Sequence, residues 1–242
     1  MQDNVNKNSN TPQKGTRKGC KDVWNAYMVR GAHFSQNDIP FCPDTATSTP
    51  ADIITWSSAL QIYKSNIGKR RCSLHYNAFV CFYQDDIAFD GPSGIWYNAR
   101  SALKVLRHFD GVITPDFSTC SDFPYPIKIY NTYRMRAFGY WLGQNGISVY
   151  NNVRWGTPET YNYCFDGIPR NETVVIGTVG GNPRKLRDRK RFEEGLSEMM
   201  KVLSPHTIIV YGSANYPCFQ KLKEQGVNII AYKSQTNRAH EK

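Results

Sequence analysis

The sequence lacks any long apolar run: no hydrophobic stretch approaches the roughly 18 residues that a membrane-spanning helix needs. Its first residues also lack the apolar centre of a secretory signal. The seven cysteines include no C-x-x-C pair, and their odd number and wide spacing are typical of reduced thiols. These absences predict a cytoplasmic protein with no membrane partner.

Motifs that identify a chemistry are also missing. The glycines within residues 178–181 match neither standard phosphate-loop pattern. No Ser-His-Asp or Cys-His grouping can be read from the spacing, and the chain contains no internal repeat. Function therefore has to be argued from where polar residues fall in the expected fold.

The composition is that of a globular protein. Of 242 residues, 40% are hydrophobic and 13% aromatic, which is enough for a full-sized core. The first residues are rich in Asn, Lys and Gln. We therefore expect a disordered basic tail over residues 1–18 and a single α/β domain over residues 19–242.

Apolar periodicity alternates between strand and helix along most of the chain. Helices are expected at residues 22–29, 53–64, 96–109, 126–146, 191–205 and 218–226, and strands at 77–83, 111–117, 147–156, 173–181, 207–214 and 227–232. Such alternation is typical of parallel β/α units, whose strands are buried on both faces. The favoured architecture is an incomplete or irregular (β/α) barrel, and the alternative is an open doubly wound sheet.

Polar residues gather where the expected strands end. In both architectures ligands bind at the carboxyl ends of parallel strands. The residues predicted there, as candidates for catalysis or substrate binding, are Asp85, Asp86, Asp116, Ser118, Asn152, Arg154, Trp155, Asp166, Gly180 and Gly212. Any single Asp or Ser after a strand is commonly a helix cap, so the prediction rests on their coincidence at one edge.

These residues suggest a division of roles. Asp116 is the candidate acid or base, and Asp85 or Asp86 the second carboxylate or a ligand of a divalent cation; no other cofactor is indicated. Arg154 is expected to hold an anion, and Trp155 to stack on a base or ring.

A second anion grip is suggested on the long helix expected at 126–146. Asn131 and Arg134 stand three residues apart and therefore share one face of that helix. The alternative for this pair is an ordinary solvated helix face.

Positive charge dominates the chain, with a formal net charge of +10. It is densest in a cluster proposed to contact a nucleic-acid backbone: Arg184, Lys185, Arg187, Arg189, Lys190 and Arg191. Clustered cations suit phosphate backbones because each neutralised phosphate releases counterions. The alternative is a solvated helix face, balanced by the Glu residues that follow at 193, 194 and 198.

Six motifs occur in a specific order: "CFYQDDIAFD", "FDGVITPDFS", "YNTYRMRAFGYWL", "VRWG", "YCFDGIP" and "IIVYGSA". In that order, over residues 22–232, the chain resembles the family catalogued as domain of unknown function 4417, from bacterial genomes, prophages and mobile elements. The resemblance implies a bacterial, phage or plasmid setting and supplies no mechanism.

Three functional hypotheses remain. The first is a mobile-element enzyme, a hydrolase or transferase, that acts on a nucleic acid, a nucleotide or another phosphorylated substrate through its aspartates. The second is a non-catalytic accessory protein that binds nucleic acid or a nucleotide. The third is an interaction protein without a small ligand, which predicts no pocket at the strand ends. Oligomeric state is not indicated by the sequence.

Overall fold

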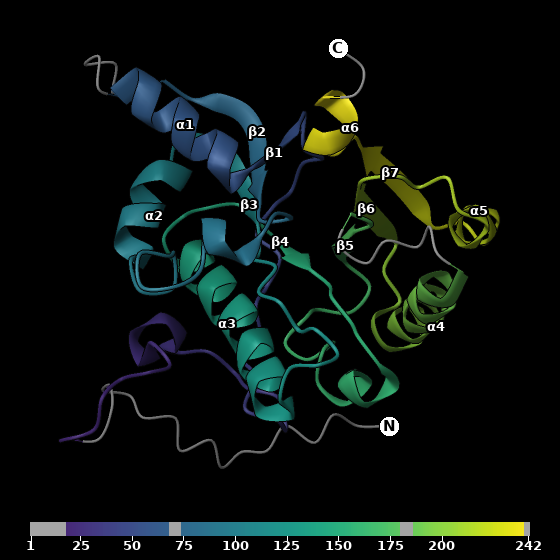
Figure 1. Cartoon of the computed structure of the whole chain (residues 1–242), viewed down its shortest axis with the longest axis horizontal. Helices are drawn as coiled ribbons and strands as arrows, with labels where there is room; N and C mark the ends of the chain where they lie inside the picture. The colour runs from purple at the N-terminus through teal and green to yellow at the C-terminus, as the bar shows by residue number, and fades with distance from the viewer. Residues whose placement is uncertain (1–17, 68–73, 180–185, 240–242) are drawn as a thin grey trace.

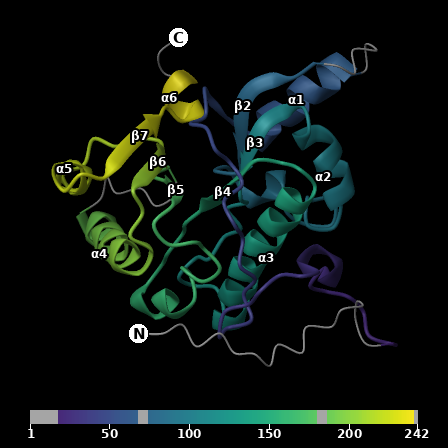
Figure 2. The same cartoon turned by 180° about the vertical axis from the view of Figure 1, so that it is seen from behind.

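The protein forms one curled sheet of parallel strands wrapped by helices (Figures 1 and 2). The computed structural model describes residues 18–67, 74–179 and 186–239. The strands are β1 (Ile53–Thr55), β2 (Tyr76–Cys81), β3 (Phe109–Ile113), β4 (Val149–Asn152), β5 (Thr173–Gly177), β6 (Thr207–Tyr211) and β7 (Asn228–Tyr232). The parallel α/β class predicted from the sequence is confirmed, as is the barrel-like curl of the sheet.

Strand order explains why the sheet curls instead of staying open. The strands lie side by side in the order of the sequence, and all six pairings are parallel. Right-handed crossovers in one unbroken direction place the helices on one face only. A doubly wound sheet needs a reversal of strand order to cover both faces, so that alternative is not adopted.

The helices cover the outside of the curl. They are α1 (Trp56–Ile67), α2 (Ala99–Leu106), α3 (Tyr125–Gln144), α4 (Leu186–Leu203), α5 (Pro217–Glu224) and α6 (Gln235–Ala239), with 3-10 turns η1 (Ala26–Val29), η2 (Asp86–Ala88) and η3 (Pro158–Asn162). In Figure 1, α1 to α3 lie beside the first four strands, and α4 and α5 beside the last three. None of the described helices is long and apolar enough to cross a membrane.

Side chains alternate across each strand, so every strand contributes to two cores. One set points into the barrel and forms the inner core: Ile53, Phe79, Cys81, Ile113, Tyr150, Val175, Ile209 and Tyr211. Their neighbours, such as Val80 and Val112 in one half and Val174 and Val210 in the other, pack under the helices. The barrel interior is therefore filled, which leaves its rim as the place for a ligand.

The first and last strands meet through side chains. No backbone pairing joins β1 and β7 in the described part of the chain. Instead, Nη1 of Arg238 donates to Oδ2 of Asp52 at 3.0 Å, and Thr55 Oγ1 donates to Gln235 Oε1 at 3.0 Å. The hydroxyl of Tyr232 donates to the carbonyl of Pro50. We call these contacts the seam, and in Figure 1 α6 lies over it between β1 and β7.

Two expected elements differ from the structure near the beginning of the described chain. Residues 53–55, expected to open a helix, form β1, because Ile53 and Ile54 pair with Phe79 and Val80 of the neighbouring strand. Only the end of the helix expected at 22–29 exists, as η1, and it is preceded by Asn25 in the left-handed region at φ 53°. Residues 1–17 of the expected tail lie outside the described residues.

Candidate functional site

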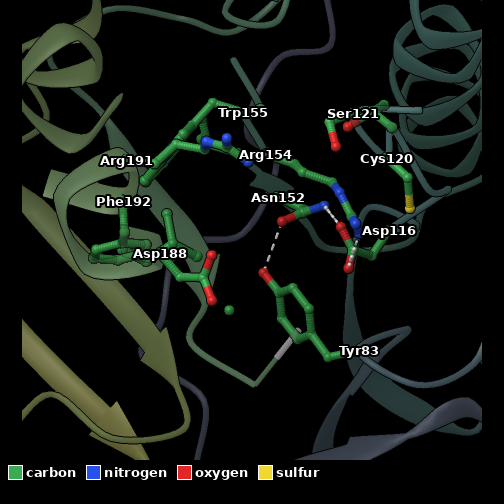
Figure 3. Close-up of a pocket in the computed structure, with 15 residues that line it drawn as sticks. Tyr83, Asp116, Cys120, Ser121, Asn152, Arg154, Trp155, Asp188, Arg191 and Phe192 are labelled. Atoms are coloured by element: carbon green, nitrogen blue, oxygen red, sulfur yellow. Dashed lines mark hydrogen bonds and ion pairs between the residues drawn. The ribbon is translucent and has the colours of Figure 1, made fainter. Parts of the chain in front are cut away.

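A cavity of about 330 Å³ opens at the carboxyl ends of strands β2 to β5 (Figure 3). Tyr83, Asp116, Asn152 and Arg154 line it from the strand ends, and the first turns of α4 add Asp188 and Arg191. The volume lies at the lower end of the range for small-molecule sites. The expected rim thus carries a pocket, which the hypothesis of an interaction protein without a small ligand did not predict.

Four lining residues form one hydrogen-bonded chain, which we call the rim network: Tyr83, Asn152, Asp116 and Arg154. The Tyr83 hydroxyl donates to Oδ1 of Asn152 at 2.8 Å. Nδ2 of Asn152 donates to Oδ1 of Asp116 at 3.0 Å, and Nη1 of Arg154 donates to Oδ2 of Asp116 at 2.7 Å. Both carboxylate oxygens of Asp116 therefore already accept a hydrogen bond.

The rim network fixes the charge of its two ends. The charge of Asp116 raises the pKa of Arg154, so the guanidinium stays cationic. Burial, followed by the charge of Asp116, raises the pKa of Tyr83 well above its usual range, so Tyr83 remains a neutral donor. The Arg154 side chain is 26% exposed, and its Nε and Nη2 have no partner among the described residues. A cation with free donors thus faces the cavity.

Two glycines make room for the aromatic walls. The Trp155 ring packs against Phe192 at 5.3 Å between centroids and lies directly over Gly195 of α4. Tyr83 stacks on Tyr211 at 5.3 Å and 15° and covers Gly177. Trp155 lines the cavity, but part of its ring already packs against Phe192 and Gly195 of α4 and is not available to a ligand.

The structure separates the two neighbouring acids at the end of β2. Asp86 is half-buried and accepts a hydrogen bond from the backbone N–H of Ser118 at 3.3 Å. Burial raises the pKa of Asp86. The nearby charge of Arg154 lowers this pKa, and that of Asp116 raises it. Asp86 is thus within electrostatic reach of the rim network, although it does not line the cavity. Asp85 is exposed and makes no cap to η2.

Arg134 and Asn131 are buried together away from the cavity, which corrects the expectation of an anion grip. Nη1 and Nη2 of Arg134 donate to the two oxygens of Asp90 at 2.8 and 2.9 Å. Nη2 also donates to Oδ1 of Asn131 at 2.7 Å, and the guanidinium lies 3.9 Å from the Phe117 ring centre. Because each of its three nitrogens donates to Asp90 or Asn131, Arg134 holds α3 to the β2–α2 connection.

Asp166 and Gly212 also lie outside the cavity lining. Asp166 accepts hydrogen bonds from Ser35 Oγ at 2.7 Å and from Asn37 Nδ2 at 2.9 Å, so it ties down the segment before β1. Gly212 follows β6 with φ 119°, where any Cβ would overlap Oγ1 of Thr178. Gly180 lies outside the described residues.

The three members of the basic cluster whose side chains the structure describes have different surroundings. Arg191 lines the cavity, whereas the guanidinium of Arg189 lies 5.8 Å from the Tyr216 ring centre. Lys190 is 80% exposed and stands 4.0 Å from Glu194. Arg184, Lys185 and the side chain of Arg187 lie outside the described residues. Arg191 therefore joins Arg154, and its two described neighbours point elsewhere.

A metal site is not preformed in the part of the chain that the structure describes. No three His, Cys, Asp or Glu side chains converge there. Asp116, the expected acid or base, has both oxygens engaged by Asn152 and Arg154, and neither Asp85 nor Asp86, the expected cation ligands, lines the cavity. The six described cysteines are all free, and burial raises the pKa of the Cys42, Cys81 and Cys164 thiols to about 12.

Several lining residues were missed by the sequence analysis, among them Tyr83, Thr119, Cys120, Ser121 and Asp188. Tyr83 directly follows the apolar run of β2, and its position at a strand end was the available signal. Cys120 and Ser121 follow Asp116 and Ser118 in the same loop. Asp188 stands within a run of basic residues, and no strand end or motif marks it as a site residue.

Sequential parallel strands with a polar cavity at their carboxyl ends define an α/β protein of the incomplete (β/α)-barrel type. Residues 32–233 match the family described as Domain of unknown function (DUF4417), and the chain belongs to that family. It is 31% identical over 204 residues to the "Gene 1 protein" of Mycobacterium phage D29, covering 83% of this chain and 69% of that protein. It is 29% identical over 203 residues to the "Gene 1 protein" of Mycobacterium phage L5, covering 83% and 82%. No solved structure gives a significant match.

Proposed function

We propose that the protein binds a small phosphorylated ligand in the rim cavity, with Arg154 as its main anion contact. One observation carries the proposal: Arg154 lines the cavity, and only its Nη1 is held by Asp116, while Nε and Nη2 have no partner among the described residues. A guanidinium offers donors in a planar fork that matches phosphate oxygens. Asp116, braced by Asn152 and Tyr83, would fix the direction of that fork.

The opposite wall brings a helix amino end and a second guanidinium to the cavity. Asp188 and Arg191 stand in the first turns of α4 and line the cavity, so the amino end of this helix faces it. Unpaired backbone N–H groups at a helix amino end favour anions. Arg191 supplies a second guanidinium. The size of the cavity suits a mononucleotide or sugar phosphate better than a stretch of duplex.

This assignment gives Asp116 a positioning role in place of the acid or base role expected from the sequence. A general base must lie within hydrogen-bond reach of the substrate proton, and hydrogen bonds that its oxygens already accept compete with that contact. Both oxygens of Asp116 accept hydrogen bonds from the rim network. The carboxylate therefore serves to orient and charge Arg154.

A second candidate function is hydrolysis or group transfer at phosphorus, with Asp86 as proton donor. The observation that favours it is the raised pKa of Asp86, which burial produces beside Asp116. A carboxyl group whose pKa is raised by burial keeps its proton to a higher pH than an ordinary aspartate, which favours a role as general acid. In this reading Arg154 would stabilise the transferring phosphoryl group.

The test is isothermal titration of the full chain with adenosine 5′-monophosphate and pyrophosphate. Arg154→Gln should weaken binding of a phosphorylated ligand by about 10- to 100-fold, the usual loss when a charged hydrogen bond is removed. Arg107→Gln is the matched control, because Arg107 is exposed at the end of α2 and outside the cavity. Equal affinity of the Arg154 variant and the wild type would disprove the proposal.

The same variants separate binding from catalysis. If the protein only binds, Asp86→Asn should keep the affinity, and no product should form from any phosphorylated probe. If it is a hydrolase or transferase, the wild type should form product, and Asp86→Asn should stop turnover while still binding. Fluorescence anisotropy with labelled DNA and RNA across a salt series tests the nucleic-acid alternative, since backbone contacts weaken steeply with salt.

A further inference from the structure

The α4 wall of the cavity carries a carboxylate where an anion site would be expected to exclude one. Asp188 lines the cavity together with Arg191, three residues later on the same helix. Figure 3 shows the Asp188 carboxylate directed into the open space across from the rim network. Acid and guanidinium are therefore both available to whatever fills the cavity.

None of the side chains that the structure describes neutralises the carboxylate of Asp188. Within the described residues it forms no ion pair and accepts no hydrogen bond, and Arg191 forms no ion pair either. An acid in the first turn of a helix does stabilise the amino end of that helix. That role needs no access to the cavity, and it does not explain why this half-buried acid lines the cavity that also holds Arg154 and Arg191.

We infer that Asp188 accepts a hydrogen bond from a hydroxyl or amino group of the ligand while Arg154 and Arg191 hold its phosphate, which makes the ligand a nucleotide or sugar phosphate instead of a bare inorganic anion. This inference rests on the proposed function and specifies its ligand. Asp188 becomes the specificity-determining residue of the site.

The physical basis is the opposite effect of one carboxylate on two kinds of ligand. A bare phosphate brings only negative charge and acceptor oxygens, so Asp188 repels it. A sugar phosphate brings donor hydroxyls a few bonds from its phosphate, and a carboxylate accepts such donors strongly. The same side chain thus rejects inorganic phosphate and favours the sugar ester.

The experiment is calorimetric titration of the full chain with inorganic phosphate, ribose 5-phosphate and adenosine 5′-monophosphate. Asp188→Asn should weaken the two esters by about tenfold, because a charge-assisted hydrogen bond becomes a neutral one. It should strengthen inorganic phosphate by several-fold, because the repulsion disappears. Opposite signs from one substitution are the expected signature.

Asp85→Asn is the matched control, since Asp85 is exposed near the same rim but does not line the cavity. It removes the same charge and should change the affinity for each of the three probes by no more than about twofold, which is the scale of screened surface charges. If Asp188→Asn strengthens all three probes, or changes none, the inference is overturned while the proposed function stands. If no probe binds the wild type, or Arg154→Gln binds the esters as well as the wild type, the proposed function fails and the inference with it.

Discussion

Two acid–arginine pairs in this protein have similar lengths and differ in how many other groups the arginine contacts. Arg134 with Asp90 and Arg154 with Asp116 are both close pairs of 2.7–2.9 Å. Arg134 is 9% exposed, and its donors are used by Asp90 and Asn131 above the ring of Phe117. Arg154 is 26% exposed, and only one of its nitrogens, Nη1, donates to Asp116.

The difference between the pairs lies in what remains after the ion pair has formed. A guanidinium with every edge engaged can only hold structure together, whereas one with a free edge in a cavity can hold a ligand. The same acid–base partnership therefore serves stability at α3 and positions a binding group at the rim. Exchanging the acids for amides separates these two uses.

The largest effect is expected from Asp90→Asn. Removing one partner of a well-buried pair leaves the Arg134 charge uncompensated, which typically costs about 3–5 kcal/mol of unfolding free energy. For a chain of this length that corresponds to a fall of roughly 10 °C in Tm. Differential scanning calorimetry measures the change. Ligand affinity should be unaffected in the folded variant, and a change of less than about 2 °C would show that the pair is not structural.

A third acid sharpens the comparison, because Asp44 is held by an amide instead of an arginine. Its Oδ1 accepts from Nδ2 and the backbone N–H of Asn151 at 2.8 and 3.2 Å, while Asp44 Oδ2 and Asn151 Oδ1 are buried without a partner. Burial raises the pKa of Asp44 from 3.8 to about 7, against the lowering effect of the Asn151 hydrogen bonds. A proton on Oδ2 would supply the donor that Asn151 Oδ1 lacks.

Asp44→Asn should therefore stabilise the protein at alkaline pH. Because the folded state binds this proton more tightly than the unfolded chain, its contribution to stability is complete below pH 3.8 and is lost as the pH rises through about 7. The asparagine carries a permanent donor and should exceed the wild type by on the order of 2 kcal/mol at pH 8.5, and by little at pH 5. Thermal melts of both proteins from pH 5 to 9 test this. A difference that does not grow with pH would contradict it.

Gly195→Ala tests the aromatic wall on the side of Arg154. A Cβ at this position would overlap Cδ1 of Trp155, so the indole must shift. The overpacking costs about 1–3 kcal/mol, and the better helix propensity of alanine returns up to about 1 kcal/mol. We expect a net loss of about 1 kcal/mol together with weaker ligand binding. Gly226→Ala, which meets no neighbouring atom but has φ 86°, is a control that strains the backbone without touching the cavity.

The smallest loss of stability is expected from Asp116→Asn. Water reaches Arg154 once its partner is neutral, so the loss should stay at or below about 1 kcal/mol, or 2–4 °C in Tm. Calorimetry of this variant beside Asp90→Asn compares one substitution in two settings. Equal losses in the two variants would remove the distinction between the pairs.

The parallel β/α pattern could be predicted from the sequence because buried strands and amphipathic helices carry local signatures. The run around Val112 and the helix ending near Gly146 were both located within a few residues. β1 was missed because Ile53 and Ile54 run without a break into the apolar face of α1. Their strand conformation depends on pairing with β2, which no local pattern records.

The site could be predicted only as far as strand ends determine it. Asp116 and Arg154 follow buried strands, Asn152 ends one, and the three meet in the rim network. The burial of Arg134 could not be predicted, because its partner Asp90 lies 44 residues away in the chain. Only the folded structure shows that the Arg134 guanidinium is paired. Asp188 was overlooked because its surroundings in the sequence are basic, whereas its surroundings in space are the cavity.

Closure of the barrel by side chains joins residues that the ribosome makes far apart in time. Asp52 and Arg238 are 186 residues apart, so the seam cannot form until nearly all of the described chain has left the ribosome. The half built from α1 to α3 can bury its own apolar faces long before that point. We therefore expect the nascent protein to remain an open, partly folded sheet, with β1 not yet joined to β7, until α6 has been synthesised.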